Sequence, residues 1–507
     1  MKNAVSLLFL LSAASACAAD LAVSPVPVAA GVAFEVVTDA PCMGADWKAV
    51  DSTGATFAGF VQQRHAGQRF LVGVPAAAPG EVTFSARMSD GNGGAWTVDG
   101  KPSPWVGSAA KCEKRGEAVV PRKVAADAEA PRVSAGPALA GWLADGKTAF
   151  AVGDTVGFRF HVSEPGEVTL HRFGDDRVDE FHKIAADAEG DVALDVVASK
   201  PGVVSVEAKT PKGALTLAAV VAFDGIRGKV ARPDDFDAFW AEMRKTAAAG
   251  LDRAELKPMG KGFAVTMPCG AAMPMTGGFS VPADAGKGSC TAVMSFPGYN
   301  ATASAGVPLP LKGKILFDFN PHGTPLGMPG AFYEEFAKTN GIANYGFEAD
   351  RNLSRETTYF HDMALRLLAA VAFVKSRPEW NGRIEVNGGS QGGFLSLLAA
   401  ALEPSVKKVD ALYPWMCDLD SDVSGYYGGW HPHYTPALAY YFPLNHAASV
   451  RAEKVNLTIG LADTTCTPYG IIALYNELAV PKSVKVYQAA WHCGPSRNAK
   501  LDFSRER

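Results

Sequence analysis

The sequence predicts an α/β domain preceded by two all-β sandwich modules. Up to about residue 226, short alternating strands lie between Gly, Pro and Asp turns, roughly ten residues apart and with no helical run, as in β-sandwiches. After Gly228, apolar strands alternate with helical segments, which indicates a doubly wound α/β domain. The length of 507 residues agrees with about three domains.

The first residues have the three-part layout of a secretory signal peptide. Lys2 supplies a positive start, residues 5–11 are almost entirely apolar, and small residues follow up to Ala19. We therefore predict that residues 1–19 are a signal peptide and that the protein is exported to the periplasm, the medium or the outer surface. A lipid anchor on Cys17 is the alternative, although the Leu that usually precedes such a Cys by three residues is missing. No later run of about 18 apolar residues predicts a membrane span.

Residues 20–122 and 123–228 each have about the length of an immunoglobulin-like sandwich. The stretch 122–131, rich in Ala, Asp and Glu and ending in Pro, marks the seam between them. Neither module carries a decisive ligand site. Binding a polysaccharide, covering the next domain and acting as a spacer therefore all stay open as roles.

Residues 229–507 carry the α/β pattern. A helix is predicted at 233–249, because Pro233 stands at its start and two Asp residues lie in its first turn. The predicted strands are 291–296, 314–319, 383–386, 409–413, 455–459 and 484–487. The helices predicted between several of them are 360–375, 392–402 and 469–478.

Charge and cysteine content exclude several classes of protein. A formal net charge of −4 leaves no basic footprint for nucleic acid. Eight cysteines are too few for a disulfide scaffold, and no Cys-x-x-Cys or His/Cys cluster has zinc spacing, so we predict no metal. Two disulfides are suggested by neighbourhood alone, and they are Cys42 with Cys112 and Cys269 with Cys290.

Ser390 is the candidate nucleophile, in the turn Gly388-Gly389-Ser390-Gln391-Gly392. The turn joins the strand 383–386 to a predicted helix, which is the context that a Gly-x-Ser-x-Gly nucleophile elbow requires. Glycines allow a strained turn where side chains would collide with neighbouring backbone. A tight strand-to-helix turn with an incidental serine is the alternative interpretation.

The acid and the base of a triad should follow the serine, in that order, after later strands. His492 comes after the strand 484–487, whereas His431, His433 and His446 do not follow such a strand. Asp463 lies just past the strand 455–459 and is the predicted acid. The competing acids follow the strand ending at residue 413, and they are Asp418, Asp420 and Asp422.

An oxyanion hole should combine the backbone N–H after the nucleophile with one from an early loop. Gln391 supplies the first N–H. The loop Pro297-Gly298-Tyr299-Asn300 follows the strand 291–296, and we predict the Tyr299 N–H as the second donor, with Asn300 as the weaker candidate.

Four motifs occur in order within residues 229–495, and they are DFDAFW at 235–240, PGY at 297–299, GGSQGG at 388–393 and GLADTTCTP at 460–468. With them, this part of the chain resembles the acetyl xylan esterase and cephalosporin C deacetylase family, carbohydrate esterase family seven. The resemblance implies an α/β-hydrolase fold, a triad of Ser390, Asp463 and His492, and oxyanion donors at Tyr299 and Gln391. It also implies substrates that are acetyl esters on small sugars, short oligosaccharides or xylan fragments, cleaved without a metal or organic cofactor.

Two positions depart from the family pattern. Asn320-Pro321-His322-Gly323 stands where the family usually has Arg-Gly-Gln-Gly, and Cys493 follows the base where the family usually has Glu. Because Cys466 and Cys493 lie close in sequence to the acid and the base, we hypothesise a disulfide that braces the two catalytic loops.

Aromatic residues near the site could shape a sugar pocket. Trp415 follows the strand 409–413, and Trp491 precedes the base, so both are predicted to line it. Trp430, His431 and His433 are expected in a lid or insertion.

The leading function is removal of acetyl groups from carbohydrates. The alternatives are another α/β-hydrolase, such as a carboxylesterase or peptidase, and a carbohydrate-binding surface protein with a degenerate esterase domain. The sequence leaves the oligomeric state open.

Overall fold

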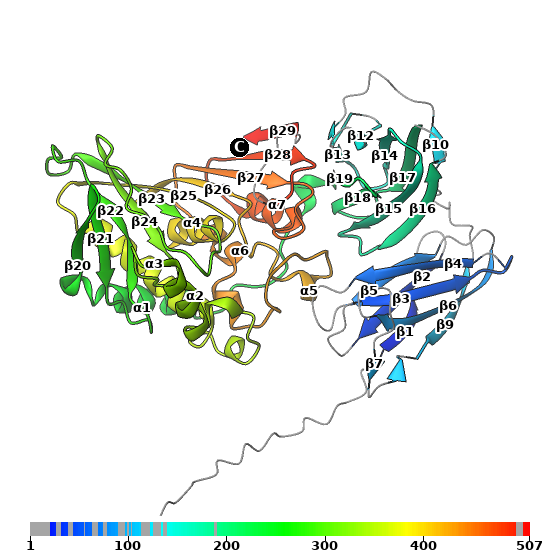
Figure 1. Cartoon of the computed structure of the whole chain (residues 1–507), viewed down its shortest axis with the longest axis horizontal. Helices are drawn as coiled ribbons and strands as arrows, with labels where there is room; N and C mark the ends of the chain where they lie inside the picture. Colours follow the sequence, from blue (N-terminus) through cyan, green and yellow to red (C-terminus); the bar gives the residue numbers. More distant parts are fainter. Residues whose placement is uncertain are drawn as a thin grey trace, which may run out of the picture. The chain divides into compact units, whose positions relative to one another are not determined.

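The computed structural model describes most of the chain in two compact units (Figure 1). One unit comprises Met1–Val119 with Val178–Phe181, and the other comprises Val120–Arg177 with His182–Arg507. The residues described are 21–26, 32–38, 44–54, 56–62, 69–74, 79–89, 97–98, 101–102, 104–112, 122–124, 133–134, 139–144, 146–186, 190–492 and 500–506. The predicted signal peptide with Cys17, and also Cys42 and Cys493, lie outside them.

The first unit is built from antiparallel strands. A three-stranded sheet has the order β1-β2-β5, a four-stranded sheet has the order β4-β3-β6-β9, and β7 pairs with β8. Their bounds are β1 (Leu21–Val26), β2 (Val32–Thr38), β3 (Gly44–Val50), β4 (Thr56–Gln62), β5 (Arg69–Val74), β6 (Gly80–Ser89), β7 (Thr97–Val98), β8 (Lys101–Pro102) and β9 (Val106–Cys112). Phe84 stacks on both Phe34 and Trp47 in its buried core.

A second all-β region opens the second unit. Its sheets have the orders β10-β17-β14-β12-β11 and β13-β19-β18-β15-β16. The bounds are β10 (Arg122–Val124), β11 (Val133–Ser134), β12 (Leu139–Leu143), β13 (Ala149–Phe150), β14 (Thr155–Val162), β15 (Gly166–Gly174), β16 (Glu180–Ala186), β17 (Gly190–Val197), β18 (Gly202–Thr210) and β19 (Gly213–Val221). We call this region the second β-region.

The α/β domain has one ten-stranded sheet of order β20-β21-β22-β24-β23-β25-β26-β27-β28-β29. Within this order, each neighbouring pair in the run β24-β23-β25-β26-β27-β28 is parallel. The remaining pairs, at both ends of the sheet, are antiparallel. The bounds are β20 (Glu255–Met259), β21 (Gly262–Met267), β22 (Met275–Ser280), β23 (Cys290–Phe296), β24 (Lys314–Asn320), β25 (Trp380–Gly389), β26 (Val406–Leu412), β27 (Lys454–Gly460), β28 (Lys482–Gln488) and β29 (Lys500–Glu506). A mostly parallel sheet with helical crossovers confirms the predicted α/β class.

Helices connect these strands. Their bounds are α1 (Phe236–Ala248), α2 (Gly330–Thr339), α3 (Tyr359–Lys375), α4 (Gln391–Leu402), α5 (Ser421–Ser424), α6 (Pro443–His446) and α7 (Pro468–Glu477). The 3₁₀ turns are η1 (Phe223–Gly225), η2 (Leu251–Arg253), η3 (Ile342–Asn344), η4 (Arg351–Leu353), η5 (Leu438–Tyr440) and η6 (Ala447–Ser449). The helix predicted at 233–249 starts three residues later than expected, because the Phe236 N–H closes a turn on the Pro233 carbonyl before the helix begins.

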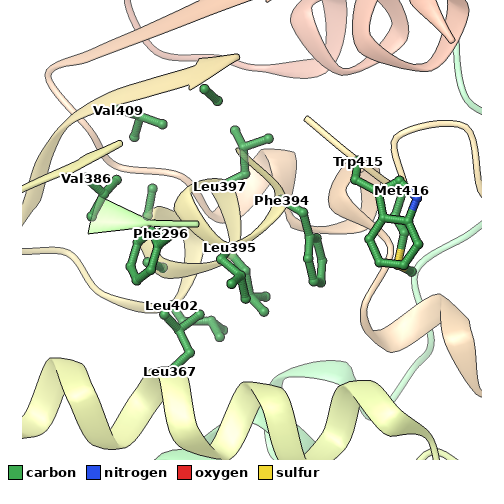
Figure 2. Close-up of a cluster of buried hydrophobic side chains, with 14 of the residues drawn as sticks. Phe296, Leu367, Val386, Phe394, Leu395, Leu397, Leu402, Val409, Trp415 and Met416 are labelled. Atoms are coloured by element: carbon green, nitrogen blue, oxygen red, sulfur yellow. The ribbon is translucent and has the colours of Figure 1, made fainter. Parts of the chain in front are cut away.

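Helix α4 lies in the centre of the hydrophobic core. Figure 2 shows Leu395 and Leu397 of this helix among Phe296, Val386 and Val409 from three strands. Every residue of α4 is buried except Ala401, which is half-buried, as expected for a helix that is apolar all round. The dense packing holds the start of α4 in place.

The second β-region shares this core and belongs to the same compact unit. Val220, Phe223 and Ile226 pack in one cluster with the helices of the α/β domain. The Gln488 side-chain amide donates to the Ala218 carbonyl at 2.8 Å and accepts from the Ala218 N–H at 2.9 Å. The predicted boundary at residue 228 therefore lies inside one unit.

Four cysteines carry free thiols, and they are Cys269, Cys290, Cys417 and Cys466. Cys269 and Cys290 are both buried and do not form a disulfide, so the pairing suggested from the sequence is wrong. Cys466 is likewise a free thiol, which does not agree with the hypothesised bond to Cys493. Among the residues that the structure describes, no helix combines the length and apolar character needed to cross a membrane.

Candidate active site

Ser390 occupies a strained turn between β25 and α4. Its φ of 57° and ψ of −120° lie outside the regions that a serine normally adopts. A Cβ on Gly392 would stand 2.0 Å from the Phe296 carbonyl oxygen, so only glycine fits there. The Ser390 N–H donates to the Leu412 carbonyl at 2.9 Å, and its carbonyl accepts from the Trp415 N–H at 3.0 Å. The surrounding strands thus hold the strained residue in position.

His492 and Asp463 complete a hydrogen-bonded chain with this serine. The His492 Nε2 lies 2.9 Å from Ser390 Oγ, and its Nδ1 lies 2.9 Å from Asp463 Oδ2. The other carboxylate oxygen of Asp463 accepts from the N–H groups of Thr465 and Cys466, at 2.8 and 2.9 Å. These backbone bonds orient the carboxylate toward the imidazole.

The three competing acids have other partners. Asp418 accepts from the Gly429 N–H at 2.9 Å and from the Thr467 hydroxyl at 2.6 Å. Asp420 accepts from the Tyr426 hydroxyl, and Asp422 lies 3.4 Å from His433. Among the four acids weighed from the sequence, the structure brings Asp463 to the histidine.

The loop that carries Tyr299 is hydrogen-bonded to Gln391, the first residue of α4. The Gln391 N–H belongs to the first turn of the helix, where backbone donors lack intrahelical acceptors. The Gln391 side chain donates to the Pro297 carbonyl at 3.2 Å and accepts from the Tyr345 hydroxyl. The loop that carries Tyr299 is thereby tied to the nucleophile turn. Asn300 instead accepts from the Thr302 N–H at 3.0 Å within its own loop.

The two tryptophans predicted to line a sugar pocket have different environments. Trp491 is 62% exposed, next to His492. Trp415 is only 1% exposed, and its indole stacks on Tyr345 at 4.7 Å while its N–H donates to the Trp430 carbonyl. The prediction for Trp415 is therefore wrong, because its ring is covered by protein. Trp430, 39% exposed, is the ring that reaches the surface there.

The segment 320–323, which departs from the family pattern, contacts these aromatic rings through His322, whose ring centroid lies 5.8 Å from that of Tyr345. The Asn320 side chain donates to the Thr324 carbonyl at 2.8 Å and accepts from the Ala305 N–H at 2.5 Å. His322 lies 2.7 Å from the Tyr359 hydroxyl, and burial lowers its pKa to about 3, so its imidazole is neutral. Both residues support the loops around the site and bear no charge.

Cys466 was not foreseen as part of the site. Its thiol is buried beside Ser390, and burial raises its pKa well above the ordinary value. Donor atoms of Asp463, Cys466 and His492 lie within 4.8 Å of one another, a set of types that can hold a metal. However, both imidazole nitrogens and both oxygens of Asp463 are already engaged in hydrogen bonds of the triad arrangement.

The fold and the site together define the class of enzyme to which the protein belongs. A serine on a strand-to-helix elbow of a mostly parallel sheet, followed along the chain by an aspartate and a histidine that bond in series, is the arrangement of serine α/β-hydrolases. The profile of the acetyl xylan esterase family matches residues 215–424 and 434–502. The chain belongs to this family.

Individual relatives are more distant. An acetyl esterase of Xylanibacter ruminicola is 29% identical over 187 residues, which cover 34% of this chain and 41% of that protein. The chain thus spans about two fifths of the curated relative it matches. A solved acetyl xylan esterase of Paenibacillus sp. R4 has 24% identity, a TM-score of 0.43, and coverage of 54% of this chain and 93% of its own. Acetyl xylan esterase 1 of a Thermoanaerobacterium species has 22% identity, a TM-score of 0.40 and the same coverage of both chains.

Proposed function

We propose that this protein is a serine esterase that removes acetyl groups from acetylated sugars, oligosaccharides or xylan fragments through an acetyl-enzyme intermediate. The observation that carries the proposal is the Ser390–His492–Asp463 hydrogen-bonded chain in a member of the acetyl xylan esterase family. Because the hydrogen bonds from serine to histidine to aspartate are all present, they also weigh against a degenerate esterase domain.

In the first step the serine attacks the acetyl carbonyl carbon. Asp463 accepts the Nδ1–H of His492, a tautomer assigned from the hydrogen bonds, so Nε2 is free to take the proton from Ser390 Oγ. The carbonyl oxygen becomes an oxyanion as the new C–O bond forms. Asp463 stays ionised and stabilises the imidazolium.

The oxyanion is stabilised at the start of α4. We assign its donors to the backbone N–H groups of Gln391 and Tyr299, and the α4 N-terminus adds its favourable dipole. Loss of one such donor typically costs about 3 kcal/mol of transition-state stabilisation.

Collapse of the tetrahedral intermediate completes the acylation. The bond between the acetyl carbon and the sugar oxygen breaks, and His492 Nε2 returns its proton to that oxygen, which leaves as the sugar alcohol. Water then attacks the acetyl-enzyme with His492 as the base, and acetate leaves while Ser390 regains its proton.

Other parts of the chain fit an exported carbohydrate esterase. We propose that residues 1–19 direct export, and that both all-β regions are immunoglobulin-like modules. The lengths of the regions and their alternating strands support this assignment.

Acetyl release from a panel of acetylated xylo-oligosaccharides, by wild type and by Ser390→Ala, tests the proposal. We expect the variant to lose at least about 10⁴-fold in kcat, because the nucleophile is absent. Equal thermal unfolding of the two proteins serves as the folding control. Undiminished acetyl release by the variant would falsify the mechanism.

A further inference from the structure

The segment from Gly425 to Trp430 lies outside the family match, which stops at residue 424 and resumes at residue 434. It follows α5 and has no regular secondary structure. The side chains that hold its first residues come from the second β-region, most of which also precedes the matched part of the chain. The family pattern therefore accounts for neither the segment nor its support.

Three side chains of the second β-region contact the backbone at the start of this segment. The Asp175 carboxylate accepts from the Tyr427 N–H at 3.1 Å, and its second oxygen accepts from the Val203 N–H at 2.5 Å. The Lys200 ammonium donates to the Gly425 carbonyl at 3.3 Å, and the Arg177 guanidinium donates to the Tyr426 carbonyl at 3.4 Å. Asp175 is buried, so its two hydrogen bonds are shielded from water.

The end of the segment is fixed on the loop of the catalytic acid. The Trp430 N–H donates to the Thr465 carbonyl at 2.8 Å, and Thr465 in turn bonds Asp463. The close approach of this segment to the loop of the catalytic acid depends on Gly429, because a Cβ there would stand 2.2 Å from the Thr465 carbonyl oxygen. Trp430 is thus placed two hydrogen bonds away from the triad.

The Trp430 indole packs on the rings that surround the nucleophile turn. It stacks on Tyr345 at 5.5 Å with an interplanar angle of 11°, and lies 5.8 Å from Tyr299 and 4.9 Å from Phe347. Tyr345 bonds the side chain of Gln391, the residue after the nucleophile. With 39% of its surface exposed, Trp430 offers an accessible aromatic surface next to the ring of Tyr345, which bonds the residue after the nucleophile.

We propose that Trp430 is the platform on which the pyranose ring of the acetylated sugar packs, and that the second β-region positions this platform through Asp175. The inference rests on the proposed function and names the part of the site that recognises the sugar. The C–H face of a pyranose packs on an indole, whereas an ester without a sugar has no ring for this contact. Asp175 acts through the segment, so it is a positioning residue.

Two substrates distinguish a loss of sugar binding at Trp430 from a loss of ester hydrolysis itself. Acetylated xylobiose carries the sugar ring, and ethyl acetate carries the same acetyl group on a leaving group without any ring. For Trp430→Ala we expect the ratio of kcat/KM for the sugar ester to that for the ethyl ester to fall about tenfold. The fall should come from KM, and Trp430→Phe should restore part of the ratio.

Variants of Asp175 test the positioning role. Asp175→Ala removes the acceptor for two backbone N–H groups, so the ratio should fall in the same direction as for Trp430→Ala. Asp175→Asn keeps an acceptor oxygen and should keep most of the ratio. Val423→Ala, an exposed change just before the segment, is the matched control. If Asp175→Ala does not fold, Lys200→Met tests the same support.

The outcomes distinguish failure of the platform, of the positioning role and of the proposed function. An equal loss on both substrates for Trp430→Ala, or an unchanged ratio, overturns the platform while leaving the esterase intact. An unchanged ratio in folded Asp175→Ala and Lys200→Met overturns the positioning role. Acetyl release that does not depend on Ser390 overturns the proposed function itself.

Discussion

At the scale of single residues, the site depends on glycines that let Ser390 keep its strained conformation. The elbow needs two close backbone approaches, at Gly388 and Gly392, where a Cβ would stand within 2.5 and 2.0 Å of the Phe296 carbonyl oxygen. Gly389 differs, because a Cβ there would meet its nearest atom at 3.7 Å, an ordinary contact.

A matched pair of alanine variants checks this distinction. Gly392→Ala forces either Phe296 or the start of α4 to move, and a displacement of about 1 Å at the nucleophile lowers kcat/KM by about 100-fold. Gly389→Ala should have a much smaller effect. Hydrolysis of 4-nitrophenyl acetate measures both variants, and equal losses for the two would contradict the steric explanation.

At the scale of structural elements, the second β-region is attached to the α/β domain by polar as well as apolar contacts. Asp175 is at this junction, with Asp176, Lys200 and Tyr469 as its titratable neighbours. Burial raises the pKa of Asp175 from 3.8 to about 7. A carboxyl whose pKa is raised on folding stabilises the folded state most at low pH, and this contribution is lost as the pH rises toward 7.

The variant Asp175→Asn removes this pH dependence. Relative to wild type, its unfolding free energy should increase between pH 4 and pH 7 by up to about 4 kcal/mol, because the variant never carries the buried charge. Urea unfolding at pH 4 and pH 8 measures the difference, with Asp252→Asn at an exposed position as the control. A difference that is independent of pH would show that Asp175 does not titrate in this range.

At the scale of the whole molecule, the core is not confined to the part of the chain that matches the family. Val203 of the second β-region lies in the same buried cluster as Phe236 and Trp240 of α1. Val203 precedes the family match, which starts at residue 215. The second unit is therefore the smallest part of the chain expected to fold as the esterase.

Two truncations test this expectation. The fragment 120–507 contains the complete shared core, and we expect it to unfold cooperatively and to keep Ser390-dependent esterase activity. The fragment 229–507 exposes the apolar surface that Phe223 and Ile226 cover, so it should aggregate or lose activity. Size-exclusion chromatography, thermal unfolding and hydrolysis of 4-nitrophenyl acetate decide between these outcomes. Full activity and stability of 229–507 would contradict the shared core.

Much of the α/β domain could be predicted because its signals are local. The six predicted strands correspond to β23 to β28, and the four predicted helices correspond to α1, α3, α4 and α7, with bounds shifted by a few residues. Apolar runs, glycines and prolines are properties of neighbouring residues in the chain, so they can be read without the fold. The strands β20 to β22 and β29 were not predicted. They lie at the ends of the sheet, and β20 contains Pro258 while β22 contains Gly277 and Gly278, residue types that are depleted in strands.

The sequence by itself determined the order Ser390, Asp463, His492 and the family, since each residue follows a recognisable strand in a chain whose motifs occur in sequence. Only the tertiary structure decided that Trp415 is covered while Trp430 is exposed, and that Asp175 bonds Tyr427, 252 residues away. The physical reason is that burial and hydrogen bonding depend on which distant segments meet. No local pattern around Trp415, Trp430 or Asp175 encodes those neighbours.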